Sequence, residues 1–122
     1  MESTIFIGIV LIHFLADFGL QTNDQAINKS SSNTWLTYHV GVYSIVWLIA
    51  AYCFLFPGDP LLSLEFSMIT YVLHFVTDWI TSRIGKPFWE KKDLHNGFTV
   101  VGFDQVLHYI QLVLTYEFLY NN

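Results

Sequence analysis

Residues 61–84 read LLSLEFSMITYVLHFVTDWITSRI, a mostly apolar run with Glu65 near its start and His74 and Asp78 near its end. A helix that crosses the hydrocarbon core of a bilayer needs about 20 predominantly apolar residues. Because His74 and Asp78 lie four residues apart, a helix places both side chains on one face, one turn apart. The stretch therefore predicts a membrane-spanning helix that carries a polar pair on a single face.

The same pair recurs in two other apolar segments. His13 and Asp17 repeat the order and the spacing, and Asp104 and His108 repeat the spacing in reverse order. A further histidine, His39, is the only ionisable residue of a fourth apolar segment. Each apolar segment therefore carries at least one candidate polar site residue.

We expect four spans, at residues 4–25, 35–56, 61–84 and 98–120. The first apolar run ends near residue 20, and we expect the polar residues 21–25 to extend its helix into the headgroup region.

The connections between the spans are also predicted. Pro57 and Gly58 predict a tight turn after the second span, and Gly85 and Pro87 predict the end of the third. We expect the polar residues 86–97, which include His95, to form a loop.

Composition places the chain in the membrane class. Its 122 residues suffice for one domain, and 53% of them are hydrophobic while only 12% are charged. Soluble domains carry about 25% charged residues. The net charge of −5 and the lack of a basic stripe exclude nucleic acid as a partner. We therefore expect an all-α, four-helix transmembrane bundle that forms a single domain over residues 1–122, with the lipid bilayer as its partner.

The basic residues predict the orientation of the bundle. Lys29 falls between the first two spans, and the other four basic residues fall at or after the end of the third span, between residues 83 and 92. All five then lie on one side of the membrane, and the positive-inside rule makes that side cytoplasmic. Both termini are expected to lie outside.

This orientation brings the polar pairs to one depth. The fourth span runs opposite to the first and third, so its reversed pair restores the same arrangement. Each aspartate lies near the cytoplasmic end, and each histidine lies about 6 Å deeper, since four residues rise about 1.5 Å each. The predicted site comprises His13, Asp17, His39, His74, Asp78, Asp104 and His108.

Charge compensation suggests what this cluster binds. Each charge in the bilayer costs at least about 2.5–3.5 kcal/mol, and the predicted spans contain no lysine or arginine except Arg83, at the end of the third. The carboxyl groups can be protonated, paired with imidazolium or bound to a metal cation. A divalent metal also accepts neutral imidazole, and imidazole with carboxylate favours zinc, with manganese and iron as alternatives. Asp17, Asp78 or Asp104 is the candidate general base. The alternative, that the cluster only links the helices by hydrogen bonds and binds no metal, remains open.

The order of these motifs resembles a known pattern. His13-x3-Asp17-x3-Gln21, a lone histidine, His74-x3-Asp78 and Asp104-Gln105-x2-His108 resemble a domain-of-unknown-function family of small bacterial and phage inner-membrane proteins. The resemblance covers about residues 10–110 and implies an inner-membrane location without implying an activity. The pattern is also loosely similar to membrane-bound metal-dependent hydrolases, which place His and Asp pairs on transmembrane helices.

Three functions fit these observations. The first is a metal-dependent hydrolase that acts on a lipid or a lipid-linked substrate, with one or two metal ions. The second is a proton or metal-ion conductor, which would need a homo-oligomer and which the mainly apolar helices beyond the histidines disfavour. The third is a structural or regulatory protein that binds another membrane protein. A phage-encoded protein that binds a host membrane protein is one such case.

Overall fold

The computed structural model describes residues 1–122, and every regular element in it is helical. The elements are α1 (Ser3–Phe14), η1 (Leu15–Gly19), α2 (Asn23–Asn28), α3 (Asn33–Ala50), η2 (Ala51–Leu55), α4 (Pro60–Glu90) and α5 (Leu94–Tyr120). Here η1 and η2 are π-helical turns that continue α1 and α3. The all-α prediction is confirmed.

Three helical segments are long and apolar enough to cross a membrane. They cover Asn33–Leu55, Pro60–Glu90 and Leu94–Tyr120. The remaining apolar helix, Ser3–Gly19, is shorter. The prediction of spans at the second, third and fourth positions is therefore confirmed at this level, and the first span stays a prediction.

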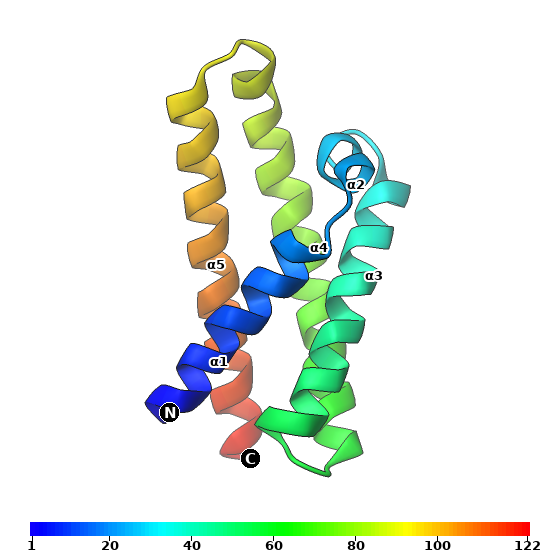
Figure 1. Cartoon of the computed structure of the whole chain (residues 1–122), viewed down its shortest axis with the longest axis vertical. Helices are drawn as coiled ribbons and strands as arrows, with labels where there is room; N and C mark the ends of the chain where they lie inside the picture. Colours follow the sequence, from blue (N-terminus) through cyan, green and yellow to red (C-terminus); the bar gives the residue numbers. More distant parts are fainter.

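The helices α3, α4 and α5 run side by side, and α1 lies obliquely across them (Figure 1). Helix α4 packs against both α3 and α5. The two termini lie at one end of the bundle, while α2 and the α4–α5 connection lie at the other (Figure 1). All five basic residues belong to the end opposite the termini, as the orientation argument requires.

The first helix does not continue through residues 21–25, so that prediction is wrong. The chain leaves the helix at Leu20, and Thr22 starts the separate helix α2. Thr22 Oγ1 accepts from the Gln25 backbone N–H, and Gln25 Oε1 accepts from the Thr22 backbone N–H. This reciprocal capping box satisfies the first backbone donors of a new helix. The polar run therefore turns the chain back over the bundle instead of extending it.

The third helix does not end at Gly85 and Pro87, and the predicted loop at residues 86–97 shrinks to three residues. Helix α4 continues to Glu90 and contains Pro87 in its last turn. A proline there removes one backbone hydrogen bond. Lys92 has a φ of 57° and ends the helix in a Schellman motif, because its N–H bonds to Trp89 O and the next N–H bonds to Phe88 O. His95, predicted in a loop, lies in the first turn of α5.

The interior is apolar toward the end that holds the termini. The large buried side chains there include Trp47 and Phe66, both with no exposed area, and Phe56 and Tyr116. Many large apolar residues face outward instead, such as Leu11 and Phe103. An apolar exterior around a partly polar interior is the arrangement expected for a bundle surrounded by lipid.

Candidate metal centre

All seven predicted site residues are buried, and none has more than 8% of its surface exposed. The structure brings six of them into two overlapping groups. The first group contains Asp17, His39, His74 and Asp78, and the second contains Asp17, Asp104 and His108. The π-turn η1 carries Asp17, and such turns often occur at functional sites. Since each long helix contributes, the fold itself assembles the cluster.

The first group has the spacing of a tetrahedral metal site. The Nε2 atoms of His39 and His74 lie 3.2 Å apart. Asp17 Oδ1 lies 3.0 Å and 3.5 Å from these nitrogens, and Asp78 Oδ2 lies 3.4 Å and 3.6 Å from them. Ligands about 2.0–2.1 Å from a tetrahedral zinc ion lie about 3.3–3.4 Å from one another. The five separations therefore fit the edges of such a tetrahedron.

The two facing imidazoles could also accommodate a cation between them. Two neutral rings can place only one proton between their facing nitrogens, and a ring that accepts that proton must carry its own on Nδ1. His74 Nδ1 is buried and has no hydrogen-bond partner. A cation between the rings uses both Nε2 lone pairs directly. The donor set of two imidazoles and two carboxylates fits zinc.

Lys29 is a member of the cluster that the sequence argument missed. Its Nζ donates to Asp78 Oδ2 over 2.8 Å, and only 18% of its side chain is exposed. Burial alone would lower the pKa of Lys29, but the carboxylates of Asp78 and Asp17 outweigh it and raise that pKa above its usual value. The ammonium group therefore stays charged. The capping segment of α2 is the sequence feature that turns Lys29 back toward the cluster.

The charges of the cluster indicate how many divalent cations it could neutralise. The cluster holds three carboxylates, from Asp17, Asp78 and Asp104, and one ammonium, from Lys29. With neutral histidines this leaves two negative charges. One divalent cation neutralises them, whereas a second would leave an excess of positive charge in a buried site.

His108, which was a predicted site residue, and Thr81, which was not, contact the carboxylates of Asp78 and Asp104. His108 Nε2 lies 3.1 Å from Asp78 Oδ1 and 3.3 Å from Asp104 Oδ2. Thr81 donates its hydroxyl to Asp104 Oδ1. Groups of this kind orient metal-binding carboxylates and tune them.

His13 lies outside the tetrahedral group. Its Nε2 is 2.7 Å from Gln105 Oε1, and its Nδ1 is 2.8 Å from the Tyr43 hydroxyl. Gln105 Nε2 in turn donates to Asp17 Oδ2 over 2.9 Å and to Asp104 Oδ2 over 3.1 Å. A chain of hydrogen bonds thus runs from Tyr43 through His13 and Gln105 to the carboxylates. Sequence reasoning counted His13 as a ligand and gave Tyr43 no role, because spacing along one helix does not show partners on the others.

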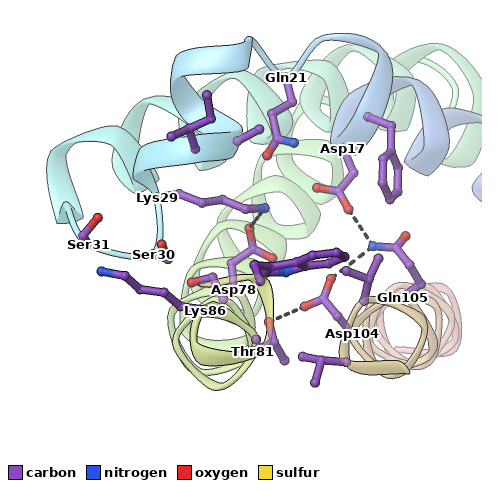
Figure 2. A pocket seen from close by; sticks show the side chains of 18 of the residues that line it. Asp17, Gln21, Lys29, Ser30, Ser31, Asp78, Thr81, Lys86, Asp104 and Gln105 are labelled. Atoms are coloured by element: carbon purple, nitrogen blue, oxygen red, sulfur yellow. Dashed lines mark hydrogen bonds and ion pairs between the residues drawn. The ribbon is translucent and has the colours of Figure 1, made fainter. Parts of the chain in front are cut away.

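A cavity of about 550 Å³ adjoins the cluster. Asp17, Asp78 and Asp104 form part of its wall, together with Lys29 and Gln105 (Figure 2). Its other walls come from η1, α2, the following turn, and the adjoining parts of α4 and α5, which place it at the end opposite the termini. The buried cluster is therefore reachable from that end.

Comparison with known proteins gives a single family. No curated protein and no solved structure matches the chain. One family model, described as a protein of unknown function (DUF3307), matches residues 5–122. This agrees with the resemblance to a family of unknown function, and nothing in the match assigns the hydrolase likeness. The chain belongs to the DUF3307 family.

Proposed function

We propose that this chain is a membrane-embedded, zinc-dependent hydrolase that acts on a lipid or lipid-linked substrate at the cytoplasmic surface of the inner membrane. The observation that carries the proposal is the tetrahedral set formed by His39, His74, Asp17 and Asp78 beside a cavity of about 550 Å³. A buried metal site next to a substrate-sized cavity is the arrangement of a metallohydrolase.

Each polar group has a role in this proposal. A cation held by these residues would supply a polarised water molecule of lowered pKa. Asp78 is the proposed fourth ligand, and Lys29 holds its Oδ2 in place. Asp104 is the proposed general base, since it faces the cavity and lies outside the tetrahedral group. Gln105 donates hydrogen bonds to both Asp17 and Asp104 and so fixes their relative positions.

Ion conduction fits the structure less well. The prediction that the helices beyond the histidines are mainly apolar needs correction, because Ser63, Ser67 and Thr70 of α4 are buried in line with His74. However, Ser63 donates to a backbone carbonyl at the start of its own helix, and Ser67 donates to the Ser44 carbonyl of α3, so both hydroxyls are occupied by structural bonds. Farther along, the buried apolar side chains around Phe66 fill the interior. This favours a site that opens on one side only.

The test combines metal content with turnover. Purified protein loaded with zinc is incubated with a panel of lipid esters and phosphoesters, and Asp78→Asn is compared with Asp24→Asn, which changes an exposed aspartate of α2. We expect near-stoichiometric zinc and hydrolysis in the wild type and in Asp24→Asn, and neither in Asp78→Asn, because an amide cannot supply the ligand charge. Full activity of metal-free protein would refute the proposal and leave the cluster as a tie between helices.

A further inference from the structure

We infer that the cavity binds the phosphate group of a phosphate ester whose alcohol is a membrane lipid. The inference rests on the proposed function and deepens it, because it assigns the chemical class of the substrate. Three features support it: hydrogen-bond donors with unused capacity in the cavity wall, two lysines in that wall, and an apolar wall beside the donors.

Several hydrogen-bond donors of the cavity wall have unused capacity. Lys29 has three N–H donors and uses one on Asp78. Lys86 has as its nearest carboxylate Glu90, at 3.9 Å, and Ser82 Oγ is buried without a partner. Ser30 and Ser31 add two hydroxyl groups to the same cavity. In the view of Figure 2, Lys29, Lys86, Ser30 and Ser31 lie on the side away from Asp104 and Gln105.

Such a wall needs a ligand with many acceptor oxygens. A phosphate ester offers several, and lysine is a frequent phosphate-binding side chain. The carbonyl of a carboxylic ester offers one neutral acceptor, so it would engage fewer of these donors. Glu90 also lines the cavity, beside Lys86. With one divalent cation, the positive charges of that ion, Lys29 and Lys86 would balance the four carboxylates of the wall, so the cavity would not repel an anionic ligand.

The rest of the cavity wall is apolar. Phe18, Ile27 and Trp89 line it and are 44%, 71% and 40% exposed, and Val100 and Val101 adjoin them. Apolar side chains directly beside lysines and hydroxyls suit an amphipathic molecule. The cavity also lies at the end of the bundle that carries all the basic residues, where the proposed orientation places the cytoplasmic headgroups. We therefore assign the alcohol part of the ester to a lipid and not to a water-soluble molecule.

The reaction balances as hydrolysis. The water oxygen forms a bond to phosphorus, and its proton passes to Asp104. The bond between phosphorus and the lipid oxygen breaks, and that oxygen takes the proton. The products are the lipid alcohol and phosphate, so no oxidant, reductant or further reactant is needed.

The experiment uses zinc-loaded, full-length protein and two substrates. One is phosphatidic acid in phosphatidylcholine vesicles, and the other is the water-soluble ester p-nitrophenyl phosphate. Released phosphate and released fatty acid are measured separately. Lys86→Gln is compared with Lys91→Gln, which removes the same charge at the end of α4 but outside the cavity. Binding is measured independently, as a change in the phosphorus NMR signal of phosphatidic acid when zinc-loaded Asp104→Asn is added.

We expect phosphate release from phosphatidic acid, with a KM raised about tenfold by Lys86→Gln and unchanged by Lys91→Gln, as suits one lost charge-assisted hydrogen bond. Zinc content should be equal in both variants. Release of fatty acid without phosphate, or no binding of phosphatidic acid, overturns the inference while leaving a zinc hydrolase in place. A kcat/KM for p-nitrophenyl phosphate equal to that for phosphatidic acid overturns the lipid assignment. Binding of phosphatidic acid without turnover of any substrate overturns the proposed function instead.

Discussion

Replacing His39 by alanine should remove most of the metal affinity of the protein. The Nε2 atom of His39 lies 3.0–3.4 Å from the other three atoms of the tetrahedral group, and no other element offers a nitrogen at that position. The wild type should bind one zinc ion per chain, because one divalent cation neutralises the cluster. His39→Ala should then leave a site with three ligands.

The size of the effect follows from the linkage between binding and stability. Changing a group that only orients a ligand costs about 10–100-fold in metal affinity, so losing a ligand should cost at least about 100-fold. At free zinc of 1,000 times the wild-type Kd, the ion adds about 4.1 kcal/mol to the free energy of unfolding. A 100-fold weaker site then sits at ten times its own Kd and retains about 1.4 kcal/mol. Zinc-linked stability should thus fall by about 2.7 kcal/mol.

The assay is the free energy of unfolding in mild detergent, with buffered zinc and with a chelator, together with elemental analysis. His95→Ala is the matched control, because His95 is exposed in the first turn of α5 and lies outside the cluster. It should keep both the zinc and the stabilisation. Two zinc ions per chain would refute the charge argument, and an equal response to zinc in His39→Ala and His95→Ala would refute the tetrahedral site.

Three further predictions follow from the same geometry. Lys29→Met should lower the free energy of unfolding of the metal-free protein by about 3 kcal/mol, since it removes the ammonium partner of a buried carboxylate; Lys91→Met should not, and zinc should recover most of the loss. Gln105→Ala should weaken zinc binding about 10–100-fold in a competition titration; Asn33→Ala, which removes an exposed hydrogen bond from Arg83, should leave the affinity unchanged. A reporter fused after Asn122 should be active only outside the cytoplasm, and cytoplasmic activity would overturn the proposed orientation.

The sequence was sufficient to predict the long helices and the meeting of the polar pairs. Apolar runs of the right length define α3, α4 and α5 to within a few residues at most of their ends. The reversed order of Asp104 and His108 compensates for the reversed direction of α5, and this depends only on chain direction and helical rise. Such regular geometry can be read from spacing alone.

The helix ends could not be predicted because they depend on local hydrogen bonds and tertiary packing. Pro87 suggested a stop, yet one lost bond in the last turn of α4 is tolerated. The indole of Trp89 packs against Gly97, where an added Cβ would lie 3.0 Å from its ring, and this contact joins α4 to α5. Thr22 could have been recognised, because a threonine followed three residues later by glutamine is a capping box.

The wrong prediction for residues 21–25 also changed the expected charge of the site, through the position of Lys29. With residues 21–25 treated as part of the first span, the next basic residue falls in a loop and the three aspartates lack any cation, which leaves room for two metal ions. Once α2 is seen as a separate capped helix, its end delivers Lys29 to Asp78. The uncompensated charge falls from three to two, which suits one divalent ion. The Thr22 cap lies 17 residues from His39, the nearest histidine of the tetrahedral group. By placing Lys29 it affects how many cations the cluster would balance, and variants that disrupt the Thr22 cap should alter zinc stoichiometry without touching a ligand.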